Sequence, residues 1–255
     1  MGPAITPEKV LRKDFLRSYR TERDALHAQM LSMNTRLFFM RKLLDFPFHL
    51  FSDDQLFGFW DTVYYSLFES TIVTMYRVGL DTHKSGVLTL QGLAKTVSKN
   101  IAEESDRETF DNACKKSILI QQHEELRTKV SQIRNHFIAH VNRDKISLLS
   151  RSQSSQLHVT LSELETIRTA MNDYFAILCL GEGLGVMLIQ YDGKTQDHSE
   201  LTDIDALLDW VARSSPVLNM PEQDPNVWRV HREDLSEDDV AVLNHWRVKF
   251  SLQPV

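Results

Sequence analysis

A run of apolar residues near the N-terminus constrains the fold of this chain more than any other feature. These residues recur at alternating intervals of four and three, which places them on one face of an α-helix. They are Leu26, Met30, Met33, Leu37, Met40 and Leu44. Thr6-Pro7 is typical of a helix start, and Pro47 limits the other end. The pattern predicts a first helix of unusual length that ends before Pro47.

A second amphipathic helix is predicted after Pro47. Ser52-Asp53-Asp54-Gln55 has the form of a capping box, in which the side chains of the first and fourth residues cap a helix start. A single helical face follows it and is rich in aromatic residues. The face consists of Phe57, Trp60, Tyr64, Phe68, Ile72 and Met75. We expect this helix to be central to the core.

Two further long helices are predicted, with a short helix over 90–100 before them. The third begins near Glu108, ends near Asn142 and carries an apolar stripe with coiled-coil-like spacing. That stripe consists of Leu126, Val130, Ile133, Phe137 and Val141. The fourth begins at the capping box Thr160-Leu161-Ser162-Glu163 and stops at Gly181.

These stripes predict an all-α protein, an up-and-down bundle of four long helices. Each helix has one apolar face, which it can bury only against the others. The chain contains only 9 Gly and 7 Pro in 255 residues, which favours helices over a turn-rich β fold. We assign residues 1–191 to the bundle and residues 192–255 to an acidic C-terminal extension packed on it. The extension is expected to contain helices over 204–213 and 237–250.

The sequence predicts a cytoplasmic protein without a membrane segment. Cys114 and Cys179 lie inside apolar helical patterns and have no metal-ligand spacing, so neither a disulfide framework nor a zinc ribbon is indicated. The first ten residues lack the pattern of a secretory signal. The apolar stretch 174–191 is interrupted by Glu182 and three glycines, which favours a buried helix end over a membrane span.

Charge is unevenly distributed along the chain, although the net charge is only -6. Residues 126–151 contain six basic residues and one acid, a local balance of +5. Residues 195–240 contain twelve acids and three basic residues, a local balance of -9. Both segments can be ordinary solvated surface. The alternative is an acidic tail that covers, or competes for, a basic site.

The basic segment contains the sequence Arg134-Asn135-His136-Phe137-Ile138-Ala139-His140. On an ideal helix Arg134 and His140 are about 120° apart around the axis and roughly 9 Å apart along it. They lie about 60° to either side of the apolar stripe of the third helix. If that stripe meets a partner helix, both polar groups line the junction, which favours a site shared by two protomers.

This segment resembles the HEPN superfamily of helical-bundle proteins, which carry an Arg, four to six residues and then a His near the end of a late helix. Asn135 matches the polar residue common after that arginine. Residues 133–144, and the aromatic second helix reaching Tyr76-Arg77, look most like the abortive-infection (AbiU-like) branch. The resemblance covers roughly residues 6–191.

The resemblance implies an endoribonuclease without metal or other cofactor, in which the 2′-hydroxyl of the RNA attacks the adjacent phosphate. Arg134, Asn135 and His140 are the implied catalytic residues. It further implies a homodimer in toxin–antitoxin or anti-phage defence, with a cognate antitoxin as a possible partner. Residues expected to bind the RNA are His136, Arg127, Lys129, Arg143 and Lys145. The alternative is a non-catalytic HEPN-like module that binds RNA or protein, or dimerises.

Three features near the motif limit this interpretation. Asn142 occupies the position where related toxins often carry a tyrosine, so control by modification of that tyrosine is not expected. His136 and His140 have the four-residue spacing of a metal pair, but no third ligand can be named. The glycines of 181–185 follow a helix rather than a strand, so they are interpreted as a helix stop and not as a phosphate loop.

Overall fold

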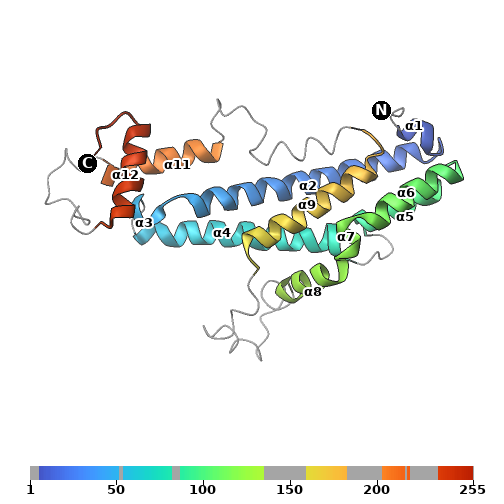
Figure 1. Ribbon diagram of the computed structural model, residues 1–255, viewed down its shortest axis with the longest axis horizontal. Coiled ribbons are helices and arrows are strands. Elements are labelled where there is room, and N and C mark those ends of the chain that lie inside the picture. The colour runs from blue at the N-terminus through green and yellow to red at the C-terminus, as the bar shows by residue number, and fades with distance from the viewer. Residues whose placement is uncertain are drawn as a thin grey trace. The chain divides into compact units, whose positions relative to one another are not determined.

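The computed structural model of the protein describes residues 6–51, 54–81, 87–134, 159–182, 203–215, 217–218 and 235–254 (Figure 1). These ranges contain helices and turns but no β-strand, and Leu11 and Ile101 form an isolated antiparallel bridge. The all-α prediction is therefore confirmed for this part of the chain. No helix within it is long and apolar enough to cross a membrane.

The chain divides into two compact units. The first comprises Met1–Phe38 and Leu67–Gln196, and the second comprises Phe39–Ser66 and Asp197–Val255. The boundaries pass through the two longest helices, α2 (Leu16–Asp45) and α4 (Asp54–Met75). The assignment of 1–191 to a bundle and 192–255 to an extension remains a prediction.

The predicted first helix is interrupted near its start. It consists of α1 (Pro7–Val10) and α2. Between them Arg12 N–H donates to Asn100 O at 3.0 Å, and Ala102 N–H donates to Val10 O at 2.9 Å. These backbone groups pair with the end of α5 (Leu90–Asn100) and do not continue the helix. The predicted end is confirmed, because α2 stops two residues before Pro47.

In the first unit, α9 (Leu161–Leu178) runs antiparallel to α2, beside which Figure 1 shows it. The buried Tyr19 donates from its hydroxyl to Leu178 O at 2.9 Å. Arg23, also buried, forms an ion pair with Glu182. Nearer the middle of both helices the rings of His27 and Phe175 stack with their centroids 6.0 Å apart.

Both predicted ends of α9 are confirmed. The capping box is present: Thr160 Oγ1 accepts from Glu163 N–H, and the Glu163 carboxylate accepts from Thr160 N–H at 2.9 Å. The helix ends with Leu180 at φ 49° and Gly181 at φ 82°. Glycine adopts this left-handed conformation without steric cost, which explains why the helix stops there.

The predicted second helix is central to the core only at its C-terminal end. Ile72 and Met75 of α4 have no exposed surface, and the chain continues into a π-helical turn, η1 (Tyr76–Leu80). The described aromatic side chains earlier on the same face are only half-buried. These are Trp60, Tyr64 and Phe68.

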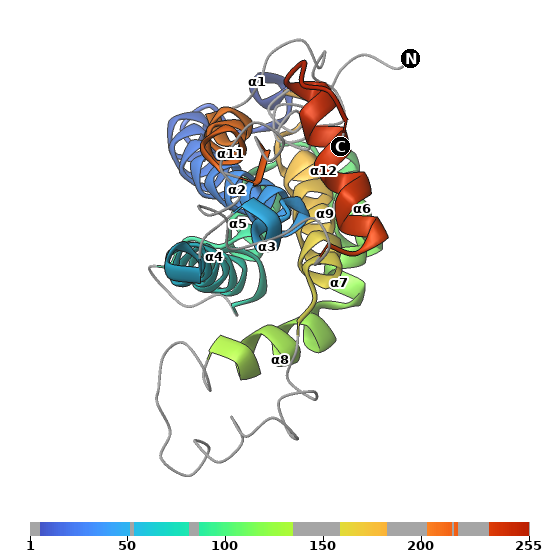
Figure 2. The same ribbon diagram turned by 90° about the vertical axis from the view of Figure 1, so that its left-hand side faces the viewer.

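The predicted third long helix is replaced by three shorter helices. These are α6 (Glu104–Lys116), α7 (Ile118–Gln121) and α8 (His123–Ile133). Ser117 has extended backbone angles, and its hydroxyl accepts from Leu119 N–H at 3.3 Å. The break allows the fully buried Leu119 to pack where α7 contacts α9. Figure 2 shows α8 crossing the direction of α6 after this break. The prediction of one continuous helix over 108–134 is thus wrong, and residues 135–142 lie outside the described ranges.

The second unit combines the end of α2 and the start of α4 with α3 (Phe48–Phe51), α11 (Asp203–Ser214) and α12 (Glu237–Lys249). The ring of Trp246 on α12 lies 5.4 Å from Phe46 and 5.5 Å from Phe51, measured between centroids. Lys42 forms an ion pair with Asp205 at 2.8 Å. The bounds of α11 and α12 confirm the two helices predicted for the acidic extension to within one residue.

Removing the Tyr19 hydroxyl tests the attachment of α2 to α9. We expect Tyr19→Phe to lower the free energy of unfolding by about 1 kcal/mol, because the buried Leu178 carbonyl loses a donor that water cannot replace. Chemical denaturation of both proteins measures this difference. Tyr65→Phe is the matched control, because the Tyr65 side chain is 61% exposed and its hydroxyl can bond to water. Equal losses in the two variants would contradict the role of the Tyr19 hydrogen bond.

Substitution by alanine at two helical glycines should change the stability of the protein in opposite directions. A Cβ at Gly79 of η1 would lie 2.7 Å from Met171 Cε and Sδ, whereas a Cβ at Gly58 of α4 would meet nothing within 4 Å. Because Met171 is fully buried, we expect Gly79→Ala to destabilise the protein by about 1 kcal/mol. Gly58→Ala should stabilise it by about 0.5–1 kcal/mol through helix propensity. Thermal unfolding measures both, and a stabilising Gly79→Ala would show that this packing is loose.

Candidate functional site

Arg134, the first residue of the predicted catalytic motif, lies directly after α8 and retains a helical backbone. Its backbone N–H donates to Val130 O, and its side chain is half-buried. The guanidinium carbon lies 4.3 Å from the centroid of the Tyr76 ring, within the range of a cation–π interaction. No carboxylate among the described residues pairs with Arg134. The first residue of the site is therefore an arginine whose guanidinium packs on the face of an aromatic ring.

The packing of α8 on η1 brings Arg134 to Tyr76. Val130 and Ile133 of α8 are 0% and 3% exposed, and Val78 and Leu80 of η1 are equally buried. Val130 and Ile133 of the predicted apolar stripe are thus covered within one chain, whereas Leu126 is half-buried. Val130 and Ile133 offer no surface to a second protomer, so this part of the stripe is not the expected dimer seam. The homodimer itself remains a prediction.

The other two described members of the predicted site have acidic partners. Arg127 Nη1 lies 3.4 Å from Glu124 Oε2, one helical turn earlier; the Glu124 side chain is exposed and the Arg127 side chain is half-buried. Lys129 forms an ion pair with Glu163, the residue that caps α9. The hydrogen bond from Lys129, followed by the one from the Thr160 N–H, lowers the pKa of Glu163 below its usual value. The ion pair of Lys129 therefore links α8 to the start of α9.

The remaining predicted site residues lie outside the described ranges. They are Asn135, His136, His140, Arg143 and Lys145. The structure consequently places Arg134 but does not place the histidines relative to it.

Two arginines that the sequence interpretation missed lie where α2 meets α4 and η1. Arg36 Nη1 donates to Thr74 Oγ1 at 3.0 Å, and Arg77 Nη2 donates to Gln29 Oε1 at 2.6 Å. Burial, and then the positive charge of Arg77, lower the pKa of Arg36. The acceptors of these hydrogen bonds, Thr74 Oγ1 and Gln29 Oε1, are neutral, so neither guanidinium charge is balanced by them.

A weak sequence signal for this pair exists. Gln29 and Arg36 are seven residues apart on one helix, as are Ser70 and Arg77 on the other. Arg36 Nη1 also lies 3.4 Å from Ser70 O. Because the two helices run antiparallel, this equal spacing allows Arg36 to reach Ser70 while Arg77 reaches Gln29. Nothing in the sequence alone shows that these two helices are neighbours in this register.

The cysteines do not form a nucleophilic or metal-binding site. Burial raises the pKa of the Cys114 thiol to about 11, only partly opposed by a hydrogen bond with Tyr174. Such a thiol is not ionised near neutral pH and is a poor nucleophile. Cys179 is buried as well, and neither cysteine forms a disulfide. No group of three or more metal-ligating side chains occurs in the part of the chain that the structure describes.

The chain was compared with protein-family models, curated proteins and solved structures, and none of the three comparisons gave a match. Functional inference therefore depends on the chain's own residues. The described centre of the candidate site is Arg134, at the start of the predicted catalytic motif, on the ring of Tyr76, which Arg77 follows in the sequence.

Proposed function

We propose that this protein is a metal-independent endoribonuclease of the HEPN type that acts in toxin–antitoxin or anti-phage defence. The observation that carries the proposal is the half-buried Arg134 guanidinium, which rests on the Tyr76 ring and pairs with no described carboxylate. Arg134 is half-buried and stacks on an aromatic ring, and its N–H donors are not taken up by a described carboxylate. A phosphate-binding arginine must keep its donors available for the ligand.

The stacked position suits phosphate binding. The contact with Tyr76 uses the face of the guanidinium, whereas its N–H donors lie in the plane and point outward from the edge. Two of these donors can bind two oxygens of one phosphate. The ring also limits the rotation of the long side chain, so less conformational entropy is lost when RNA binds.

The proposed reaction needs a proton acceptor beside this cation. His140 takes the proton of the 2′-hydroxyl, whose oxygen then attacks the adjacent phosphorus. The 5′-oxygen leaves with a proton returned by the protonated His140 or supplied by water, giving a 2′,3′-cyclic phosphate and a 5′-hydroxyl. Arg134 stabilises the additional negative charge of the phosphorane, and Asn135 orients the histidine or the phosphate. We propose that a homodimer brings these groups together.

The described cations suggest how the RNA backbone approaches. Arg36 and Arg77 have neutral acceptors and can bind additional phosphates, and Arg77 directly follows the ring under Arg134. Arg127 is half-buried and only weakly paired, with an exposed glutamate, so it too can bind a phosphate. The ion pair of Lys129 with Glu163 favours a mainly structural role for that lysine.

Substitution of either principal residue tests the nuclease. We expect Arg134→Ala and His140→Ala each to lower RNA cleavage by about 10²–10⁴-fold, because one removes charge stabilisation and the other removes proton transfer. Cleavage of total RNA in EDTA, with mapping of the cut ends, measures the activity. The parent should produce 2′,3′-cyclic phosphate ends. Circular dichroism establishes that the variants are folded.

Arg107→Ala is the matched control, because Arg107 is a solvated arginine on α6 paired with Glu104 one turn earlier. It should cleave at the parental rate. A His140→Ala variant that cuts RNA as fast as the parent would refute the enzyme and leave the alternative, a non-catalytic HEPN-like binding module.

The Tyr76 ring is a positioning element and should act through Arg134. Tyr76→Leu removes the aromatic face, and we expect it to lower kcat on a defined RNA by about tenfold through misplacement of the guanidinium. Tyr76→Phe keeps the face and should retain activity to within about twofold. A purely structural role would be indicated if both variants lost activity in proportion to their loss of stability.

A further inference from the structure

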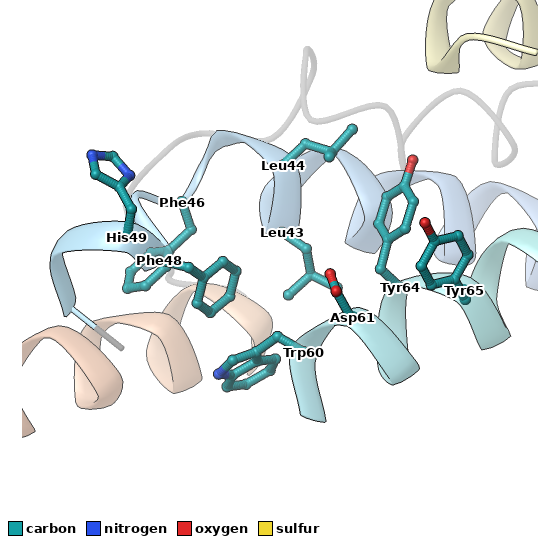
Figure 3. Close-up of a pocket in the computed structure, with 9 residues that line it drawn as sticks. All are labelled: Leu43, Leu44, Phe46, Phe48, His49, Trp60, Asp61, Tyr64 and Tyr65. Atoms are coloured by element: carbon teal, nitrogen blue, oxygen red, sulfur yellow. The ribbon is translucent and has the colours of Figure 1, made fainter. Parts of the chain in front are cut away.

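The second unit contains an aromatic pocket of about 470 Å³ that the proposed nuclease does not use (Figure 3). Side chains from the end of α2, from α3 and the residues before it, and from the first half of α4 line it. They are Leu43, Leu44, Phe46, Phe48, His49, Trp60, Asp61, Tyr64 and Tyr65. The volume lies in the lower part of the range of small-molecule sites, which is about 300–1,000 Å³.

Aromatic rings lie on both sides of this pocket. Figure 3 shows Phe48 and Trp60 on one side and Tyr64 and Tyr65 on the other. The Phe48 and Trp60 centroids are 5.0 Å apart, and those of Tyr64 and Tyr65 are 5.9 Å apart in an edge-to-face arrangement. Such rings present the negative faces of their π-systems, or their polar hydroxyl groups, to a ligand.

Asp61 is the one carboxylate among the nine lining residues. Figure 3 shows it between the two groups of rings, with its oxygens directed toward the hollow. No hydrogen bond or ion pair joins Asp61 to another described residue. Asp61 is exposed and has no described partner, so its carboxylate is available to a ligand beside the aromatic rings.

The neighbouring basic side chains are already engaged elsewhere. His49 Nε2 lies 2.9 Å from Asp239 Oδ1, and Figure 3 shows its ring turned away from the hollow. Lys42, beside Leu43 in sequence, is paired with Asp205. The lining contains no lysine or arginine. A ligand would therefore have to supply the positive charge that balances Asp61.

The first turns of the two later helices of this unit are also acidic, and two of their acids, Asp205 and Asp239, are the partners of Lys42 and His49. The first turn of α11 carries Asp203 and Asp205, and that of α12 carries Glu237, Asp238 and Asp239. Negative potential of this kind disfavours nucleic acids and other anions and attracts cations. Burial, and then the neighbouring Tyr65, raise the pKa of the Tyr64 phenol, so its hydroxyl stays neutral near pH 7.

We propose that this pocket binds a small organic cation with an alkylated ammonium group. The alkyl groups fill the space between the rings, the positive charge lies against aromatic faces, and Asp61 supplies the counter-charge. Cation–π attraction combined with apolar contact is the usual basis for recognition of quaternary ammonium ligands. The site is independent of the ribonuclease proposed above, because it uses none of the same residues.

Choline and its neutral carbon isostere, 3,3-dimethylbutan-1-ol, form the matched pair of probes. The full-length protein is titrated with each at constant ionic strength, and the tryptophan indole N–H signals are followed by NMR. Trp60→Phe identifies the Trp60 signal. We expect choline to shift that signal saturably and to bind at least about fivefold more tightly than the isostere, since only choline carries charge.

Asp61→Asn tests the counter-charge, and we expect it to weaken choline binding by about fivefold or more while leaving the isostere unaffected. Asp45→Asn is the control, because Asp45 is an exposed carboxylate of the same unit that does not line the pocket. Thermal unfolding of each variant checks its fold. Equal affinity for both probes, unchanged choline binding in Asp61→Asn, or no saturable shift with choline would each overturn the proposal.

Discussion

The attachment of α2 to the C-terminal end of α9 is the interaction on which the rest of the first unit depends. A helix end leaves carbonyl groups without partners, and Tyr19 donates to one of them, Leu178 O. One turn along α2, the buried Arg23 pairs with Glu182, just beyond that end. Buried polar groups without partners are costly, so these contacts fix both the direction and the register of the two helices.

Of the two helices joined in this way, α9 also contacts the elements that position the candidate site, η1 and α8. Met171 lies against Gly79, where a larger residue would have to displace it, so η1 approaches α9 closely. At the other end of α9, Glu163 both caps the helix and pairs with Lys129 of α8. α8 is thus held through η1 and through the start of α9. Arg134 follows α8 directly, so its position on Tyr76 results from packed helices.

The two units present opposite chemistry to a ligand. In the first, Arg36 and Arg77 are satisfied by neutral acceptors and Arg134 rests on an aromatic ring, which suits phosphate oxygens. In the second, Asp61 lies among aromatic side chains and the nearby basic side chains are paired with other acids, which suits an organic cation. Aromatic residues serve both sites. The sign of the charge beside the ring decides which ligand each favours.

The sequence by itself determined the features that depend on neighbouring residues. The capping box at Thr160, the stop at Gly181 and the end of α2 before Pro47 follow from local backbone chemistry. Of the candidate site, the sequence indicated Arg134, but it could not indicate that Tyr76 lies under it or that Arg36 and Arg77 meet, because these contacts join helices distant in the chain. Tertiary packing also decided the break at Ser117, which buries Leu119, and the interruption at Leu11, which pairs with Ile101. A helical stripe specifies which face of a helix is buried. Only the assembled structure decides which other helix that face packs against.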